Sequence, residues 1–406
     1  MSAQTEETGP ISLLSEDLLS LILNNVTDQE HRNWCSEVCK QWLQLEGLSR
    51  SSLSARKPEF PLAILNRFPN LVQFQTTQLT TDSDLELLAR KCPKLEEVKV
   101  VDFTSCQQGF LGRKGMSALG YGCRKLSKVS LIGDKIGNAA VVELVNVARS
   151  LSSLVLGHNL IGDIALRAIA WSSVTILELK SCCNVTDDGL GCLASGFTSK
   201  KLKTLVVKRC KVTDDGVKSL KKMRSLEKLS LCWCTGEITD VGGMAISAIR
   251  NLKELKLKGI YGVSDLTVSA LAFCKKLEVL DLSGCEGVTG PGIRAFSSHQ
   301  GLRRLVLLGL RSFGLSDVET LVLGCPSLDV DSVVVEERWR KDPTWRDELM
   351  HWKTRLVLKL ASKSQRCRTS FSEVCKQWRK VGGLSRSSLA PSMLTFQIEI
   401  SFREMT

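Results

Sequence analysis

Cysteine and histidine are the residue types in this sequence that could hold a metal ion or act as nucleophile and base. The chain has 16 cysteines and four histidines, which are His31, His158, His299 and His351. None of these histidines stands in a recognisable Cys/His or Ser/His/Asp arrangement. The sequence also has no phosphate-binding loop of the form G-x-x-x-x-G-K-[ST]. We therefore expect no intrinsic catalysis and no cofactor.

The cysteines recur at fixed places rather than in metal-binding pairs. Two close groups, Cys182-Cys183 and Cys232-Trp233-Cys234, leave metal binding as an alternative, but the Cys-x-x-Cys spacing of structural zinc sites is absent. One set follows a strand leucine by five residues, a place that Asn159 takes in another unit: Cys182, Cys210, Cys234 and Cys285. A second set lies three residues before a leucine: Cys92, Cys123, Cys274 and Cys325. A small polar side chain there can hydrogen-bond the turning backbone from inside, so these thiols are predicted to be core residues.

The leucines around these cysteines form an internal repeat of the form L-x-x-L-x-L. Its units are spaced by 23 to 31 residues, within the range of leucine-rich repeats. They start at Leu71, Leu95, Leu126, Leu151, Val174, Leu202, Leu226, Leu252, Leu277 and Leu302. The units that begin at Leu95 and Val174 are the longest, which predicts insertions there.

One unit shows why the pattern predicts a strand followed by a short helix. Residues 202–210 alternate apolar and polar side chains with the period of two that marks a strand. Thr213 then stands where a helix N-cap is expected, and Asp214 and Asp215 follow in the first turn, where carboxylates suit the helix dipole. Such a unit cannot bury its apolar face alone, and stacking on neighbouring units buries it.

The repeats resemble the cysteine-containing class of leucine-rich repeats over about residues 71–328. The resemblance implies an α/β solenoid, a horseshoe of about ten strand–helix repeats. We assign residues 71–330 to the repeats and 55–70 to a linker or cap, with a disordered N-terminus at 1–10.

Residues 11–54 do not follow the repeat and are predicted to form a small all-α module. Ser15 is placed as an N-cap, with Glu16 and Asp17 after it. One broad apolar helical face is expected from Leu14, Leu18, Leu19, Ile22 and Leu23. A second segment, residues 36–43, places Val38 and Trp42 four residues apart.

This module resembles the F-box, whose pattern is leucine–proline–x–acidic–Leu-Leu–x–x–Ile and later Val-Cys-Lys-x-Trp. Ser15 stands where the family usually has proline. An F-box before such repeats is similar to the F-box/leucine-rich-repeat proteins, particularly those of plants. The resemblance implies a non-catalytic substrate-recognition subunit of an SCF-type ubiquitin ligase, with a Skp-type adaptor and a cullin complex as partners. It implies adaptor contacts from Leu14, Leu18, Leu19, Ile22, Val38, Cys39 and Trp42. The alternative is that the module is only an N-terminal cap for the solenoid.

A binding solenoid is expected to hold its target on the concave strand face. The residues predicted to contact the target there are Lys180, Lys208, Arg209, Trp233, Lys256 and Lys258. This set is basic with one aromatic anchor, and it suits an acidic or phosphorylated protein segment. The alternative is that these are ordinary solvated strand residues.

The sequence after the repeats divides into two parts. Residues 331–364 are basic, contain Trp339, Trp345 and Trp352, and are interpreted as a C-terminal cap or tail. Residues 365–406 partly duplicate the second half of the F-box-like module, because 14 of the 18 residues in 372–389 are identical to those in 36–53. We interpret this copy as the relic of a gene duplication or fusion.

The net charge of +12 permits an anionic partner, and we regard nucleic acid as unlikely. The sequence shows no export signal and no apolar run long enough to span a membrane. We therefore expect a nuclear or cytoplasmic protein. The resemblance to F-box/leucine-rich-repeat proteins implies that a bound protein target is directed to ubiquitin-dependent degradation. The rival hypothesis is a leucine-rich-repeat scaffold or ligand receptor without ligase coupling.

Overall fold

The computed structural model describes residues 14–331, except for 56–61, 78–80, 103–110, 135, 159, 311 and 326–327. The described elements belong to one compact unit, Met1–Val334. The predicted tail, the predicted partial duplicate and Asn159 lie outside the described residues. Among the helices that are described, none is long and apolar enough to cross a membrane.

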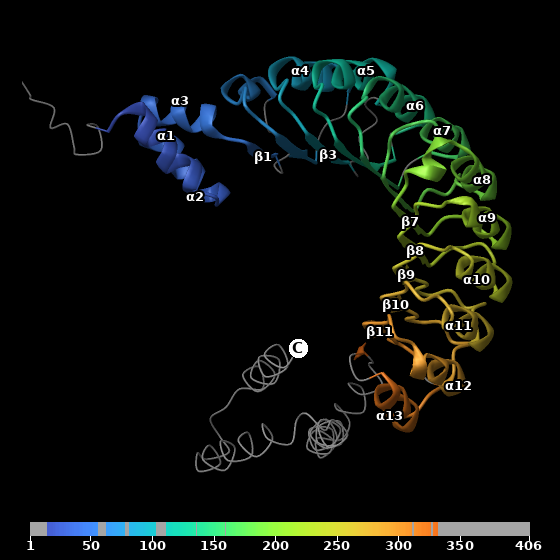
Figure 1. Cartoon of the computed structure of the whole chain (residues 1–406). Helices are drawn as coiled ribbons and strands as arrows, with labels where there is room; N and C mark the ends of the chain where they lie inside the picture. Colours follow the sequence, from blue (N-terminus) through green and yellow to red (C-terminus); the bar gives the residue numbers. More distant parts are fainter. Residues whose placement is uncertain are drawn as a thin grey trace, which may run out of the picture. The chain divides into compact units, whose positions relative to one another are not determined.

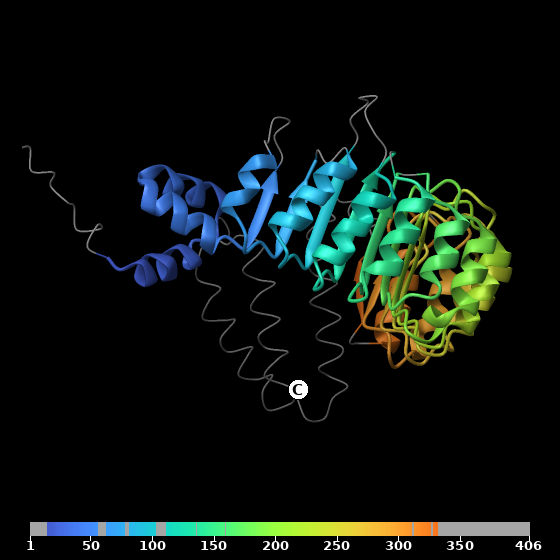
Figure 2. The same cartoon turned by 90° about the horizontal axis from the view of Figure 1, so that it is seen from above.

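Three helices open the described chain: α1 (Glu16–Asn25), α2 (Gln29–Val38) and α3 (Lys40–Ser49). The hydroxyl of Ser15 accepts a hydrogen bond from the Leu18 amide, so Ser15 caps α1 as predicted. Leu19, Leu23 and Leu45 form a small apolar core between the helices. These three helices, which we call the N-terminal module, lie at the β1 end of the sheet (Figure 2).

Twelve parallel strands form one sheet in chain order, from β1 to β12. The strands are β1 (Ser52–Ala55), β2 (Gln73–Thr76), β3 (Glu97–Asp102), β4 (Lys128–Gly133), β5 (Ser153–Gly157), β6 (Ile176–Lys180), β7 (Thr204–Lys208), β8 (Lys228–Cys232), β9 (Glu254–Lys256), β10 (Val279–Asp281), β11 (Arg304–Val306) and β12 (Asp329–Asp331). The predicted leucine-rich-repeat solenoid is therefore confirmed.

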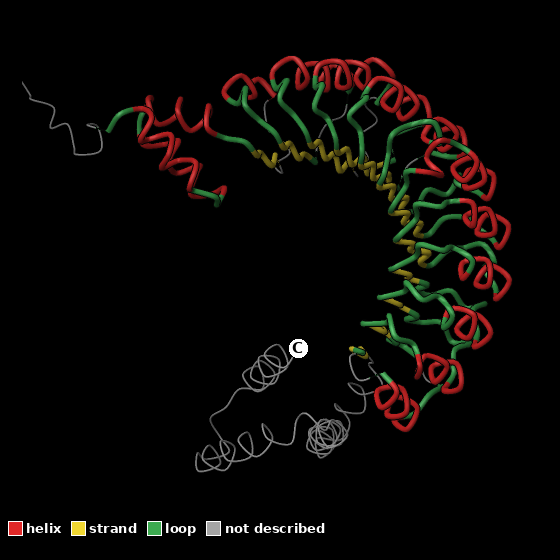
Figure 3. The backbone as a smooth tube through the Cα atoms, in the orientation of Figure 1, coloured by secondary structure: helices red, strands yellow, loops and turns green. Residues whose placement is uncertain are grey.

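The connections between the strands carry helices on the outer side of the array, while the strands lie on its inner side (Figures 1 and 3). The α-helices are α4 (Asp82–Lys91), α5 (Arg113–Gly122), α6 (Asn138–Val147), α7 (Asp163–Ile169), α8 (Asp187–Ser195), α9 (Asp214–Ser219), α10 (Asp240–Ser247), α11 (Asp265–Leu271), α12 (Gly290–Arg294) and α13 (Leu315–Gly324). Short 3₁₀ helices are η2 (Leu62–Arg67), η3 (Phe197–Lys200), η4 (Leu220–Lys222) and η5 (Ala295–Ser298). In the long unit that begins at Val174, η3 supplies the predicted insertion.

The sheet register stacks the pattern leucines into one continuous core. Leu177, Leu205, Leu229 and Leu255 are paired in turn across β6 to β9, and each is at most 1% exposed. The residues between the leucines point to the opposite side of the sheet. Neighbouring repeats thus bury the apolar face that a single repeat would expose.

Of the eight repeat cysteines predicted as core residues, six are buried, while Cys234 and Cys274 are half-buried. Cys92, Cys210 and Cys285 are fully buried, and their thiols bond backbone carbonyls of the preceding repeat, as in Cys92 Sγ to Phe68 O at 3.5 Å. Burial raises the pKa of Cys92 to about 11 and that of Cys285 to about 12. A protonated thiol is a weak nucleophile and a poor metal ligand, so a structural role fits these positions.

Strands β1 and β12 extend the array beyond the ten predicted units. Leu53 of β1 pairs with Phe74 of β2, and Val330 of β12 pairs with Leu305 of β11. The N-terminal module therefore continues directly into the sheet, although we had placed residues up to 54 in the module. The L-x-x-L-x-L pattern misses both strands because β1 has no leading leucine and β12 has the sequence Asp-Val-Asp.

Candidate binding surfaces

The N-terminal module presents large apolar side chains to solvent. Leu18 and Ile22 lie one turn apart on α1 and are 50% and 45% exposed, and Val38 at the end of α2 is 60% exposed. The other exposed apolar side chains of the module are Leu21, Trp34 and Leu48. Small cores bury such residues when they can, so this exposed surface is suited to contact another protein.

The predicted adaptor contacts fall into three groups in the structure. The exposed residues are Leu18, Ile22, Val38 and Cys39, whereas Leu14 and Trp42 pack partly against the module core. Leu19 is only 1% exposed and belongs to that core, so its prediction as a direct contact is wrong for this conformation. Helical periodicity could not separate Leu18 from Leu19, because both fit one broad apolar face. Trp34, 60% exposed, was missed because α2 has little apolar pattern.

A buried ionic cluster ties the module to the first repeats. Glu46 of α3 is fully buried, and its Oε1 accepts hydrogen bonds from Arg32 Nε at 3.1 Å and from Arg50 Nε. Arg67 of η2 brings its Nη2 to 3.7 Å from Glu46 Oε2. The same Arg67 guanidinium lies over the Phe68 ring, 5.2 Å from its centre. The cluster therefore joins α2, α3 and η2.

The arginines of this cluster also donate hydrogen bonds to backbone carbonyls of α1 and α3. Arg32 donates to the Leu23 carbonyl at 2.8 Å, and Arg67 donates to the Leu43 carbonyl at 3.4 Å. A buried carboxylate is tolerated only when cations and donors compensate its lost hydration. We infer that the cluster fixes how α1 to α3 are attached to the sheet.

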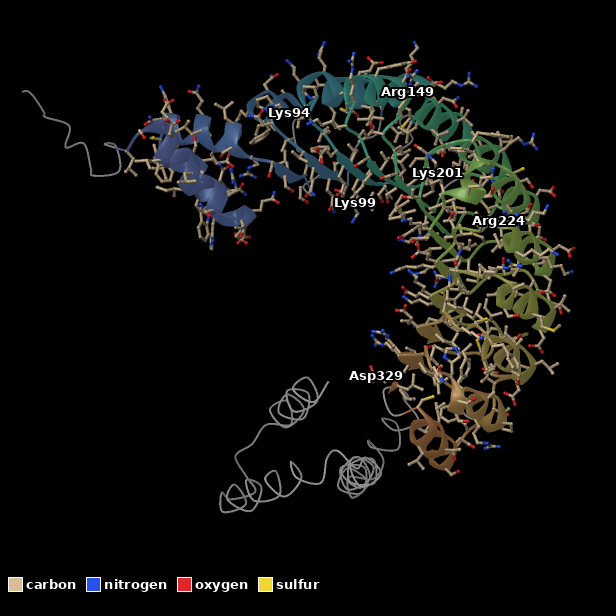
Figure 4. The ribbon with its side chains drawn as sticks, viewed as in Figure 1. Lys94, Lys99, Arg149, Lys201, Arg224 and Asp329 are labelled. Atoms are coloured by element: carbon tan, nitrogen blue, oxygen red, sulfur yellow. The ribbon has the colours of Figure 1, made fainter. Side chains whose placement is uncertain are left out.

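The side of the sheet opposite the helices, here called the inner strand face, is hollowed between β6 and β9. The hollow has a volume of about 260 Å³. It is lined by Glu178, Thr204, Leu205, Val206, Lys208, Lys228, Leu229, Ser230, Glu254 and Lys256. Lys99 of β3 also points to the inner side of the array (Figure 4).

Carboxylates neutralise part of the cationic set that the sequence predicted for this face. Lys180 pairs with Glu178 at 2.6 Å, and Lys256 pairs with Glu254 at 2.7 Å. Lys228 approaches the other oxygen of Glu254 at 3.0 Å. Within the hollow, Lys180 and Lys256 of the predicted set are therefore not free cations. Lys228 and Thr204 were missed as lining residues, although the period of two places them on the same face as Ser230 and Val206.

The unpaired cations lie instead at the ends of the strands. Among the residues that the structure describes, Lys208, Arg209 and Lys258 form no ion pair and no side-chain hydrogen bond. Trp233 lies in the repeat between them and is 43% exposed. We call these four residues the strand-end cluster. Its charges remain available to an anionic partner.

Comparison with known proteins supports the repeat assignment. A family model described as Leucine Rich repeat matches residues 172–194, 198–221 and 273–297. These segments include β6 with α8, the stretch before and through α9, and the stretch around β10 and α12.

One curated relative and two solved structures are similar to this chain. A curated relative, F-box/LRR-repeat protein 4 of Bos taurus, is 25% identical over 205 residues, which is 50% of this chain and 28% of the relative. The chain therefore spans less than a third of that protein. Rad7, solved in the yeast Rad7 and Elc1 complex, matches with a TM-score of 0.51 and 17% identity over 78% of this chain and 92% of that one. An internalin of Listeria monocytogenes matches with a TM-score of 0.46 and 17% identity over 74% and 86% of the two chains.

Proposed function

We propose that this protein is the target-recruiting subunit of an SCF-type ubiquitin ligase. The N-terminal module would bind a Skp-type adaptor through Leu18, Ile22 and Val38, and the inner strand face would hold a protein target for ubiquitin-dependent degradation. The protein would contribute no catalysis of its own, because other subunits of such a ligase supply the chemistry. The observation that carries the proposal is the exposed apolar surface of a module built into the end of a repeat array.

Three findings support the proposal. The relative that matches half of this chain is named as an F-box/LRR-repeat protein. Rad7, which shares the fold, was solved in complex with Elc1, and we infer that this chain also works with a partner. The buried Glu46 cluster attaches the module firmly to the sheet, which suits a subunit that must hold two partners at a defined separation.

We also propose that the protein works in the nucleus or cytoplasm. The described cysteines are free thiols, as expected in a reducing compartment. No cofactor is needed for this role, and the target is proposed to be acidic or phosphorylated because the strand-end cluster is cationic. A target recruited in this way would be held by many weak contacts rather than by covalent chemistry.

A pull-down with a purified Skp-type adaptor tests the proposal. The intact chain should bind, and the double variant Leu18→Asp, Val38→Asp should lose binding because it charges two exposed apolar contacts. The matched control is Leu266→Asp, Phe273→Asp, which charges two residues of the outer helical side that are 67% and 85% exposed. The control should bind like the intact chain.

Thermal unfolding followed by circular dichroism establishes that each variant is folded. If the folded intact chain binds no adaptor, or if the Leu18→Asp, Val38→Asp variant binds as well as the intact chain, the proposal is wrong. The protein would then be a leucine-rich-repeat scaffold or ligand receptor whose N-terminal module is only a cap.

A further inference from the structure

A column of left-handed backbone positions runs along the ends of the strands. His158, Ser181, Arg209 and Trp233 each follow a strand and have φ values of 51°, 55°, 52° and 54°. The next three repeats have glycine at the same place, namely Gly259, Gly284 and Gly309, with φ values of 67°, 73° and 75°. Only glycine adopts this conformation without strain.

The column is part of the repeat architecture, because its amides bridge neighbouring repeats. The Arg209 amide donates to the Cys232 carbonyl at 3.0 Å, and the Trp233 amide donates to the Lys258 carbonyl at 2.8 Å. Gly259 makes the equivalent bond to the Ser283 carbonyl at 2.8 Å. The backbone therefore needs the left-handed conformation at each place, but it does not need a side chain there. Arginine and tryptophan stand in strained positions that glycine would fill without strain.

Trp233 forms a flat shelf on the glycines that follow it. A Cβ atom added to Gly259 would lie 2.2 Å from Cε3 of Trp233, so the indole ring rests directly on the Gly259 backbone. A Cβ atom at Gly284 would lie 3.8 Å from Cη2 of the same ring. Tyr261 meets the ring edge-on, with the ring centres 6.4 Å apart. The ring is thus supported on one side while 43% of the residue stays exposed.

The charges around the shelf restrict what can bind it. Lys208, Arg209 and Lys258 flank Trp233 without a carboxylate partner among the described residues. Three cations repel a cationic ligand and attract an anionic one. The exposed ring offers a stacking surface for a planar or apolar group.

We propose that the Trp233 shelf binds a ring side chain, either aromatic or the apolar ring of proline, of an extended target segment that carries a carboxylate or phosphate within two residues of it. An extended segment rises about 3.3 Å per residue and adjacent strands lie about 4.8 Å apart, so a group two residues from the stacked ring reaches a neighbouring repeat. Arg209, in the repeat before Trp233, would take the anionic group. This proposal rests on the proposed target-binding function and names the class of segment that is recognised.

The decisive variants are Trp233→Gly and Arg209→Gly. Each removes the side chain and relieves the left-handed strain. In Trp233→Gly the loss of the ring contacts with Gly259 and Tyr261 opposes this gain, so the melting temperature serves only to show that each variant is folded. The matched control is Arg224→Gly, which removes an exposed cation outside the strand-end cluster.

The probe is a positional-scanning library of nine-residue peptides, with and without phosphoserine, applied to the purified full-length chain. The intact chain should select an aromatic residue or proline with an acidic or phosphorylated residue within two positions. Trp233→Gly should lose the preference for an aromatic residue or proline and bind the best peptide about three- to tenfold more weakly. Arg209→Gly should lose the acidic preference, and the control should change neither.

The proposal is overturned if the intact chain selects no such peptide, if it selects basic residues, or if Trp233→Gly keeps the preference for an aromatic residue or proline. The peptide assay requires no adaptor, so its result is independent of the Skp pull-down. If the chain binds these peptides but no adaptor, the proposal for the Trp233 shelf stands and the proposed ligase function is wrong.

Discussion

The carboxylate of Asp187 on α8 holds the N-cap of the next repeat, because it accepts hydrogen bonds from the Thr213 amide at 2.8 Å and the Thr213 hydroxyl at 2.6 Å. The hydroxyl of Thr213 in turn caps α9 by accepting from the Asp215 amide. Equivalent bonds join Asp163 to Thr186 and Asp214 to Thr239. From Asp163 to Thr289, the Thr-Asp motif and its serine variant at Ser264 therefore form a ladder of hydrogen bonds that joins consecutive repeats.

Removal of one rung should destabilise the array. We expect Asp187→Ala to lower the free energy of unfolding by roughly 1.5–3 kcal/mol, the usual contribution of a hydrogen bond to a charged group. Urea unfolding measures the change. The control is Asp188→Ala, because Asp188 is the exposed neighbour whose side chain makes no bond to the next repeat. Equal unfolding midpoints for the two variants would show that the ladder contributes no stability.

The glycine of the Thr-Asp-x-Gly motif should be intolerant of a methyl group. A Cβ atom on Gly216 would lie 2.3 Å from Oδ1 of Asp187, so Gly216→Ala must displace the carboxylate and is expected to lower the melting temperature. Gly191 in helix α8 is the matched control, because its added Cβ would meet only Ser219 Oγ at 3.9 Å. Gly191→Ala should stabilise by about 0.5–1 kcal/mol through higher helix propensity. The same loss of melting temperature at both sites would contradict this account.

One rung of the ladder should make stability depend on acid pH. Burial acts to raise the pKa of Asp240, but hydrogen bonds from Ser264 and Thr267 outweigh it and leave the pKa below its usual value. A depressed carboxyl pKa gives stability that is present above the unfolded-state pKa, near pH 4, and is lost as the pH falls through the folded-state value. The melting temperature of the intact chain should therefore decrease when the pH is lowered below about 4.

The variant Asp240→Asn isolates this contribution. It should melt at a lower temperature than the intact chain at neutral pH, and the difference should shrink as the pH falls from 5 towards 3. Parallel loss of stability in both proteins across that range would show that Asp240 is not responsible.

The junction between the N-terminal module and the sheet should depend on Glu46. Replacement by alanine leaves the buried guanidinium groups of Arg32 and Arg50 without their carboxylate, which we expect to cost roughly 3–5 kcal/mol of unfolding free energy. Urea unfolding is again the measurement, and Glu37→Ala on the exposed surface of α2 is the control. A Glu46→Ala chain as stable as the control would mean that the cluster does not hold the module.

The same variant separates attachment from recognition. In Glu46→Ala, a peptide that binds the Trp233 shelf should keep its affinity, because the shelf lies six repeats from the cluster. Adaptor binding should weaken only as far as the module itself unfolds, which the circular dichroism of the variant reports.

The sequence by itself determined the repeat, its phase and its caps. The spacing of leucines located β2 to β11, and Thr213 and Ser15 were recognisable as N-caps because capping needs only a local hydroxyl before a helix. Six of the eight predicted core cysteines are buried because they keep a constant offset from the strand leucines, and Cys234 and Cys274 are half-buried.

Only the tertiary structure decided which side chains are free to bind. Leu19 is buried with Leu23 and Leu45 in the core of the N-terminal module, while Leu18, the next residue round the same apolar face of α1, is exposed. Lys180 and Lys256 pair with carboxylates two residues before them on the same strands, whereas Lys208 and Arg209 form no ion pair among the described residues, because pairing depends on side-chain rotamers. Trp233 stands on Gly259, a contact between residues 26 apart. Local patterns fix periodicity and caps, whereas the depth of burial and the packing of Trp233 on Gly259 arise from contacts between repeats that no single repeat encodes.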